Sequence, residues 1–391
     1  MLTANTHIHT PHSFSSFDSV EQAVQLARAE DVRVLGISDF NTIDGFAEFS
    51  QACASQGVYP LYNIEFIAFL EKDKADGKRW NDPVNAGIMY VCGKALAHPT
   101  TLAPDSRNRL RSLWRGTQDL IWRVMQKLND HLASVNIPVA LDYNDVRTRY
   151  ARNTVRERHV VRALLDKLRE RCPDAGKLQE ALRAVYGEPS AAIDLADDVA
   201  LQNQVRGKLL KAGKPAFIEE DPSAFFTLDD VREIVVDAAG IPCYPVLADD
   251  KTGLGEYESD IGQLCEELRK RQFHAVEFIP ARNTLAHLKR YARGLRDAGF
   301  CVTFGTEHNT PGKASLVPAS RGGVPLDDDL RQLSYEGACV LAAHAARVAE
   351  DKPGYVDRRG RRLVAPQDIA AFARLGDEIV RRALGIGAKP A

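Results

Sequence analysis

The sequence has no apolar run long enough to cross a membrane and no stretch resembling a cleavable leader. Its first residues carry neither the basic nor the apolar segment of a secretory signal. The most apolar stretches, near Val235 and Val246, are interrupted by charged residues or proline well short of the roughly 20 apolar residues that a spanning helix needs. We therefore expect a chain without a membrane segment that works in the cytoplasm.

Cysteine pairs with the spacing of a metal or redox motif are also missing. The seven cysteines are an odd number, and no two of them form a Cys-x-x-Cys pair. Scattered thiols of this kind are typical of buried, reduced side chains in a cytoplasmic protein. This pattern argues against a disulfide-stabilised secreted scaffold.

Neither sign of charge is in excess. Lysine and arginine number 51 against 53 aspartates and glutamates, which gives a formal charge of −2. Such a chain has no overall field that would draw it to nucleic acid or to a membrane surface, and it lacks a basic, aromatic stretch. We expect a small anionic metabolite as partner, held by local groups, and the sequence is compatible with a homo-oligomer.

Short apolar runs alternate with helical patterns over the first hundred residues and again after residue 221, which is typical of βα units around a mainly parallel sheet. The predicted fold is α/β, a barrel or barrel-like sheet. We divide the chain into a first barrel part (1–142), a helical insertion (143–220), a second barrel part (221–315) and a C-terminal helical extension (316–391) that packs on the barrel. Strands are expected at 5–9, 32–37, 62–69, 87–92, 138–141, 242–247, 275–279 and 301–305, and helices at 19–30, 46–56, 105–134, 228–239, 261–272, 285–298, 334–350 and 366–384.

Two histidines, His7 and His9, lie on the first predicted strand. Residues one apart on a strand point to the same face, so both imidazoles can reach one ion about 2 Å away. Strand ends are also where barrel enzymes place their sites. The alternative is a pair of surface histidines on an edge strand.

Acidic residues follow the later apolar runs and favour the metal interpretation. If the strands are parallel, their carboxyl ends meet on one rim, which brings these carboxylates towards the histidine pair. Taken singly, each could instead be a helix cap or a surface ion pair. The residues in question are Asp39, Glu65, Asp249, Glu277 and Glu307.

At this point the sequence resembles the PHP (polymerase and histidinol phosphatase) family of metal-dependent hydrolases, from about Thr3 to Pro311. The resemblance implies a distorted seven-stranded barrel. The segments from Arg158 to Leu164 and from Gly213 to Phe217 look like the insertion of the phosphoesterase branch. The matching motifs are His7-Ile8-His9, Ser38-Asp39-Phe40-Asn41-Thr42, Ile64-Glu65, Val246-Leu247-Ala248-Asp249 and Gly305-Thr306-Glu307-His308-Asn309.

Departures from the family pattern reduce the expected number of metal ions. Phe14, Phe40 and Asn309 stand where the family has ligands of a larger cluster, and Asp249 replaces another histidine. One site keeps a family-like residue at every position. The resemblance therefore implies one principal ion, with a second as the alternative, bound by His7, His9, Glu65 and Glu307.

Two imidazoles and two carboxylates suit Zn²⁺, Mn²⁺ or Fe²⁺, and such an ion activates water. Beside it, Asp39 and Asp249 could orient or deprotonate the water, or could instead support the ligand histidines by hydrogen bonding. His308 is predicted as an acid or substrate contact, with an outward-facing loop histidine as the alternative.

Cationic residues of the insertion and of the rim are candidates for binding an anionic group, because the guanidinium fork matches carboxylate and phosphate. We select Arg158 and His159 in the insertion and Arg282 after the strand that carries Glu277. Most of the other charge in the insertion is interpreted as a solvated helix face.

The leading hypothesis is a metal-dependent hydrolase of a small anionic substrate, most plausibly a phosphoesterase. Phosphoesterases gain by clamping the reacting oxygens between metals, so a one-metal relative could instead be a lactonase, an amidohydrolase, an isomerase or a lyase acting on a sugar-acid-like metabolite. A third hypothesis is an inactive relative with a structural metal. A nucleic-acid-binding module is disfavoured by the charge balance.

Overall fold

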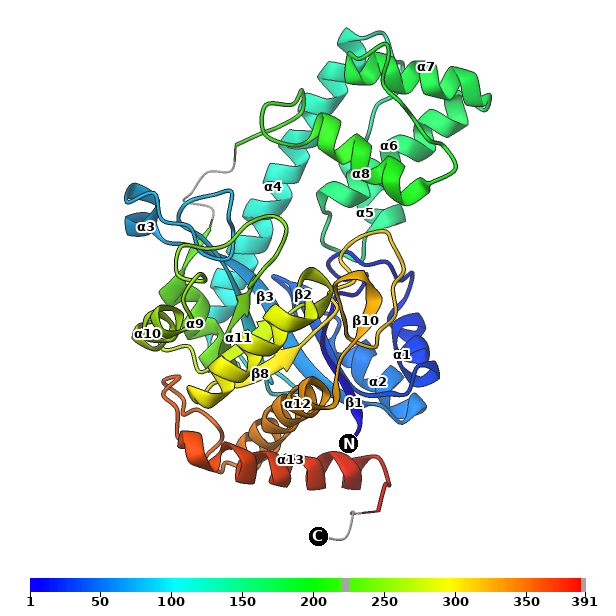
Figure 1. Cartoon of the computed structure of the whole chain (residues 1–391). Helices are drawn as coiled ribbons and strands as arrows, with labels where there is room; N and C mark the ends of the chain where they lie inside the picture. Colours follow the sequence, from blue (N-terminus) through cyan, green and yellow to red (C-terminus); the bar gives the residue numbers. More distant parts are fainter. Residues whose placement is uncertain (220–224, 388–391) are drawn as a thin grey trace.

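The computed structural model describes residues 1–219 and 225–387 and is built around a barrel-like sheet (Figure 1). Along the sheet the strands follow the order β1, β2, β3, β4, β6, β7, β8, with the short β5 (Phe226–Thr227) paired to β3. Their bounds are β1 Thr3–Ile8, β2 Val32–Phe40, β3 Tyr59–Phe69, β4 Ile88–Lys94, β6 Ile241–Val246, β7 Ala275–Phe278 and β8 Cys301–Phe304. The predicted α/β barrel is confirmed.

The sheet is parallel except at β4, which runs antiparallel to both neighbours. A parallel bridge between Ile8 and Glu307 joins the first strand to the segment after the last and nearly closes the barrel. The carboxyl ends of the parallel strands therefore meet on one rim, whereas β4 ends at the opposite end, the barrel floor. Lys94, the last residue of β4, pairs there with Ile241, the first of β6.

Helices cover the outside of the barrel because each presents one apolar face to the sheet. Val20, Ala23, Val24 and Ala27 on the first helix recur at helical spacing and are buried in the main core. Ser19 caps this helix by accepting from the backbone N–H of Gln22. The covering helices are α1 Val20–Ala29, α2 Phe46–Gln56, α9 Leu228–Asp237, α10 Ile261–Lys270 and α11 Leu285–Asp297, and a short α3 (Glu71–Ala75) lies in the loop before β4.

A helical insertion stands at the rim end of the barrel, joined to it by one long helix (Figure 1). It contains α4 (Pro104–Ser134), α5 (Tyr143–Tyr150), α6 (Glu157–Arg171), α7 (Ala175–Tyr186) and α8 (Asp198–Leu209). Its own apolar core starts at Ile121, halfway along α4, and not at residue 143. The predicted boundary at 220/221 lies outside the described residues, and the division into domains stays a prediction.

The predicted strand at 138–141 is wrong. In the described part of the chain this segment joins no sheet, because its last residue is bound by a side chain. The amide of Asn129 both donates to the carbonyl of Leu141 and accepts from its N–H, at 2.9 and 2.8 Å. The segment is therefore an extended connection held against α4.

Two C-terminal helices, α12 (Asp328–Ala349) and α13 (Ile369–Ala383), form the opposite side of the molecule from the insertion (Figure 1). α12 packs on β1 and β8, and α13 packs on α12. α12 begins six residues earlier than predicted because Asp327 caps it by accepting from the N–H of Leu330. Among the described residues, no helix is long and apolar enough to span a bilayer.

Candidate metal centre

Three ligand atoms converge at the carboxyl end of β1. The Nε2 atoms of His7 and His9 lie 3.2 Å apart, and Oε2 of Glu65 lies 3.2 Å from Nε2 of His9 and 4.0 Å from Nε2 of His7. His7 lies on β1, His9 directly follows it, and Glu65 lies on β3. The two histidines are 1% and 2% exposed, so these atoms lie in the interior of the protein.

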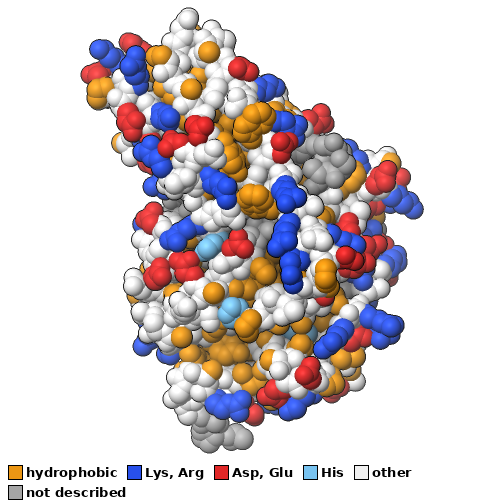
Figure 2. Space-filling view, turned by 180° about the vertical axis from the view of Figure 1, so that it is seen from behind, with side chains coloured by type: hydrophobic (Ala, Val, Ile, Leu, Met, Phe, Trp, Pro, Cys, Tyr) orange, Lys and Arg blue, Asp and Glu red, His pale blue; other side chains and the backbone are white. Residues whose placement is uncertain are grey.

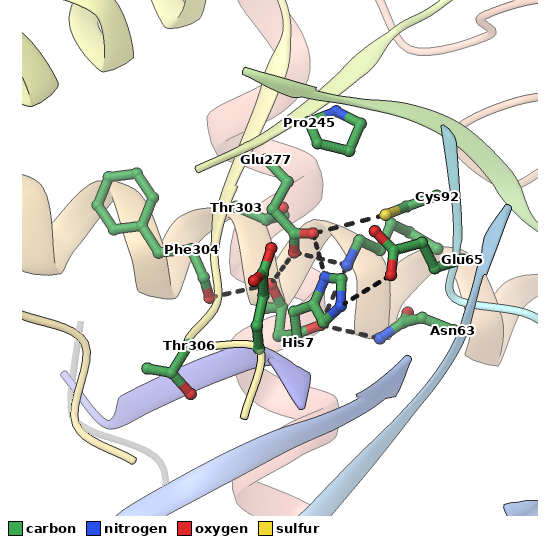
Figure 3. A network of polar contacts seen from close by, with 12 residues as sticks. His7, Asn63, Glu65, Cys92, Pro245, Glu277, Thr303, Phe304 and Thr306 are labelled. Atoms are coloured by element: carbon green, nitrogen blue, oxygen red, sulfur yellow. Dashed lines mark hydrogen bonds and ion pairs between the residues drawn. The ribbon is translucent and has the colours of Figure 1, made fainter. Parts of the chain in front are cut away.

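The other ring nitrogen of His7 contacts a second carboxylate. Nδ1 lies 2.6 Å from Oε2 of Glu277 on β7 (Figure 3). A carboxylate only accepts, so Nδ1 carries the proton and Nε2 keeps its lone pair. The hydrogen bond thus turns His7 towards His9 and Glu65 as a neutral ligand.

His9 is held in the same tautomer by a different route. Its Nδ1 lies 3.2 Å from the hydroxyl of Ser13, and this hydroxyl donates to Oδ1 of Asp39 at 2.6 Å. Since the hydroxyl proton is used, Ser13 accepts from Nδ1–H of His9. Asp39 also accepts from the backbone N–H and the hydroxyl of Thr10, so its carboxylate fixes the whole loop that carries Ser13.

These hydrogen bonds direct three potential ligand atoms at one point, an arrangement that suits a cation. With ligand bonds of about 2.1 Å, neighbouring ligand atoms of one ion lie about 3.0 to 3.4 Å apart, and two of the three separations agree. Burial opposes a charge on His9, but the hydrogen bond and charge of Glu65 raise its pKa above the ordinary value. The donor set therefore fits a divalent metal ion, bound by His7, His9 and Glu65.

Glu307, the fourth predicted ligand, lies beside the cluster but outside it. Its backbone bonds to His7 and His9, and its left-handed φ of 63° turns the chain at this point. Its Oε2 accepts from Arg282 at 2.6 Å and from Asn309 at 3.2 Å. The charge of Glu307, ahead of the burial that opposes it, raises the pKa of Arg282, which stays cationic at the rim.

Glu277 is held on its other oxygen by a buried lysine. Nζ of Lys94 lies 2.5 Å from Oε1 of Glu277 and donates to the carbonyl of Thr6 at 3.2 Å. The Thr6 hydroxyl donates to the same carboxylate oxygen at 3.1 Å. Burial alone would raise the pKa of Glu277, but the charge of Lys94 and the hydrogen bond from His7 lower it to about 2.

Asp249, predicted as a catalytic residue, caps the start of α11. Its carboxylate accepts from the side chain of Asn283 at 3.1 Å and from the hydroxyl of Thr284 at 2.7 Å. Burial would raise its pKa, but these hydrogen bonds lower it, so the group is ionised. The contacts describe a capping carboxylate at the rim, and a catalytic role for Asp249 stays a prediction.

Both ring nitrogens of His308, predicted as an acid, are engaged within the protein. Nδ1 lies 2.9 Å from the hydroxyl of Thr306, and Nε2 lies 3.0 Å from the carbonyl of Ala314. Phe17 stacks on the ring, and burial lowers the pKa of the imidazole. These contacts orient His308 between the rim loops, and a role as an acid or substrate contact stays a prediction.

The two predicted anion-binding residues of the insertion, Arg158 and His159, differ in charge. Arg158 lies over the ring of Phe14 and donates to Asn203 at 3.0 Å. His159 is 4% exposed, accepts from the N–H of Arg156, and has its pKa lowered to about 3 by burial and neighbouring arginines. A buried neutral imidazole brings no charge to an anion, so Arg158 is the stronger of the two candidates.

Sequence reasoning did not select Arg156, which begins α6. Its guanidinium lies over the ring of Phe40, 4.4 Å from the centroid, at the end of β2. Arg156 and Arg282 both act electrostatically on the hydroxyl of Tyr90, as does Glu65. Arg156 thus lies at the end of β2, and Arg282 pairs with Glu307 after β8. Figure 2 shows further Lys and Arg side chains, among acidic ones, where the insertion meets the barrel on the rear face.

The supporting residues were partly accessible from the sequence. Glu277 belongs to the acidic residues at strand ends, but its spacing gives no sign that it would contact Nδ1 of His7. Lys94 ends an apolar run and looks like an exposed residue there. Both emerge only when the sheet closes and brings β4 and β7 around β1.

Comparisons with known proteins agree with this geometry. Residues 5–83 match the family model of the PHP domain. The comparison with curated proteins gives no match.

Two solved structures share the fold. An amidohydrolase from Chromobacterium violaceum, with bound sulfate and no metal, superposes with a TM-score of 0.55 at 15% identity over 85% of this chain and 95% of the other. A candidate metal-dependent phosphoesterase from Bifidobacterium adolescentis superposes with a TM-score of 0.52 at 15% identity, over 84% and 94%. Residues 5–83 thus match the PHP domain model, in agreement with the resemblance drawn from the sequence, and the two solved structures share the barrel fold.

Proposed function

We propose that the chain is a metal-dependent hydrolase of a small anionic substrate, and that the substrate is a phosphate ester. One observation carries the proposal: Nε2 of His7, Nε2 of His9 and Oε2 of Glu65 present their lone pairs to one buried point. Burying these three acceptors without a cation would cost free energy, because each of them would face another acceptor. We propose one metal ion per chain.

When bound, a divalent ion such as Mn²⁺, Zn²⁺ or Fe²⁺ polarises a substrate oxygen and makes hydroxide available near neutral pH. The chain's own residues supply orientation. Glu277 and Ser13 fix the two imidazoles, and Asp39 fixes the loop that carries Ser13. Glu307 can turn from Arg282 towards the cluster as a fourth ligand, since its backbone already bonds to His7 and His9.

Arginine side chains favour an anionic substrate over a neutral one. Arg282 lies at the rim with its charge retained, and Arg156 lies over the ring of Phe40 at the end of β2. A phosphate bound between them would place its ester oxygen towards His7, His9 and Glu65. The bound sulfate of the amidohydrolase from Chromobacterium violaceum supports a tetrahedral anion for this fold. We extend the proposal to the insertion, as the domain that contributes Arg156 and Arg158 to substrate binding.

A second candidate function follows from the low number of ligands. The second group of possible ligands among the described residues, Cys92 and Glu277, shares His7 with the first. A single site of three protein ligands also suits hydrolysis of a lactone or an amide. The name of the amidohydrolase neighbour favours this alternative over an isomerase or lyase. A carboxylate substituent on such a substrate would use the same arginines.

Metal analysis combined with a substrate screen tests the proposal. Protein reconstituted with Mn²⁺ or Zn²⁺ is expected to hold about one ion and to hydrolyse phosphate monoesters faster than sugar lactones or amides. His7→Ala should lose both the ion and the activity, whereas the control His131→Gln, in the insertion, should keep both. Wild-type protein that binds no metal, or a His7→Ala rate equal to that of the wild type, would exclude the proposal.

A further inference from the structure

Lys94 forms a completely buried ion pair below the metal ligands. Its Nζ lies 2.5 Å from Oε1 of Glu277, and neither side chain has any exposed surface. A buried ion pair contributes little to stability, because the desolvation of both charges offsets their attraction. An apolar side chain of the same length would fill this space at least as well, so packing gives no reason for a lysine here.

The lysine completes a chain of contacts that runs from the barrel floor to the ligands. β4 is antiparallel, so Lys94 enters the barrel from the end opposite to the rim. It contacts one oxygen of Glu277, and the other oxygen contacts Nδ1 of His7 at 2.6 Å. The Thr6 hydroxyl and the Cys92 thiol occupy the remaining acceptor positions of the carboxylate, at 3.1 and 3.7 Å.

Each of these contacts restrains the carboxylate of Glu277. With contacts on both oxygens, the carboxylate is held facing Nδ1 of His7. The imidazole of His7 is therefore fixed in its plane, with Nδ1 occupied and Nε2 directed at the cluster. Partners of this kind at metal sites typically change metal affinity about 10- to 100-fold when they are removed.

We infer that Lys94 is a positioning residue for the metal centre, acting through Glu277 on His7. The inference rests on the proposed metal site but not on the reaction or its substrate. Lys94 holds the carboxylate in place and balances its charge beside the ion. Its contribution should therefore be seen in metal affinity, and it should exist only while Glu277 is a carboxylate.

A double-mutant cycle on the full chain tests the inference. The cycle compares wild type, Lys94→Met, Glu277→Gln and the double variant, with the Kd of the metal-free protein for Co²⁺ measured by chelator competition and the Co²⁺ absorption spectrum recorded. Lys94→Met is expected to raise the Kd at least tenfold and to change the spectrum. In the Glu277→Gln background, Lys94→Met should have no further effect.

A matched control is Lys289→Met. Lys289 also lies 2.5 Å from a carboxylate, that of Asp327, but between α11 and the start of α12, and its removal should leave the Kd unchanged. If Lys94→Met alone fails to fold, Glu277→Gln and the double variant still decide the matter, because the inference requires equal Kd values for the two.

The inference and the proposed function can fail separately. The role of Lys94 is overturned if Lys94→Met keeps the wild-type Kd and spectrum. It is also overturned if the two substitutions act independently, so that their effects multiply in the double variant. Either outcome leaves the metal site intact. A wild type that does not bind Co²⁺ overturns both. Absence of hydrolysis with every tested substrate affects the proposed function alone, because the cycle measures binding.

Discussion

At the scale of single residues, the partner of Nδ1 in each histidine determines the tautomer, and thereby whether Nε2 can bind a metal ion. His7 and His9 are equivalent by strand geometry, yet one is held by a carboxylate and the other by a hydroxyl. A carboxylate partner makes an imidazole a better electron donor than a hydroxyl does. We therefore regard His7 as the stronger of the two ligands, and Glu277 as the reason for it.

Arg282 is the residue whose charge the substrate is expected to use. Arg282→Met should raise KM for a phosphate ester about 10- to 100-fold, the range expected for one charge-assisted hydrogen bond, while leaving the metal affinity unchanged or tighter because Glu307 is released. Steady-state kinetics, inhibition by inorganic phosphate and metal titration measure these quantities. Arg290→Met, on the exposed face of α11, is the matched control.

A different pattern would contradict this role. If Arg282→Met lowers kcat and leaves KM and phosphate inhibition unchanged, the arginine only positions Glu307. Its ion pair with Glu307 would then be a support of the rim and not part of an anion site.

Sequence reasoning found the candidate ligands and only part of the residues that support them. His7 and His9 follow from a spacing of two on a strand, and Glu65 follows from its place at the end of an apolar run. Lys94 could not be found in this way, because an apolar run that ends in lysine is also the ordinary pattern of a strand leaving the core. Its burial depends on β4 being antiparallel, which no local pattern shows.

At the scale of elements, α12 lies unusually close to the barrel because it carries a glycine at the contact. A Cβ added at Gly337 would lie 1.9 Å from the carbonyl oxygen of Val302 on β8. Gly337→Ala should therefore push the helix away and lower the unfolding free energy by about 1 to 3 kcal/mol, as overpacking does. Urea denaturation followed by circular dichroism measures the change.

Gly207 in α8 provides the opposite case. A Cβ added there meets nothing within 4 Å, so Gly207→Ala should stabilise by up to about 1 kcal/mol through helix propensity alone. Equal effects of the two substitutions would show that α12 can shift without cost. In that event the close approach would not be needed to hold β1 and β8 in place.

Most elements could be predicted because their signals are local. Ser19 caps α1 and Gly57, in the left-handed conformation, closes α2, and serine and glycine are typical at these two positions. The strand predicted at 138–141 failed because its backbone partner is the side chain of Asn129, twelve residues earlier than Leu141, which no period of hydrophobicity reveals. The same limit applies to the core of the insertion, which begins within α4.

At the scale of the whole molecule, three parts of the structure contribute to the candidate site. The helix α12 supports β1 and β8 from outside, the barrel carries the ligands, and the insertion brings Arg156 over Phe40. The family pattern predicted the barrel and its rim. The sequence selected Arg158 in the insertion but not Arg156, whose position over Phe40 depends on how α6 begins relative to β2.

Glu258, buried in the loop that follows β6, makes the stability of the whole molecule depend on pH. Burial raises its pKa to about 7, although the N–H of Leu247 and the hydroxyl of Tyr244 partly oppose the shift. The folded protein thus keeps a proton that the unfolded chain releases near pH 4.5, so the unfolding free energy falls as the pH rises between these values. Above pH 7 the loss amounts to about 3 kcal/mol.

Glu258→Gln removes this dependence without removing the acceptors for Leu247 and Tyr244. The melting temperature of the variant, relative to that of the wild type, should therefore increase from pH 5 to pH 8, whatever constant offset the new amide introduces. Thermal melts at matched ionic strength measure this difference. A difference that stays flat over this range would mean that Glu258 is ionised in the folded protein at pH 5, and that the hydrogen bonds from Leu247 and Tyr244 outweigh the cost of its burial.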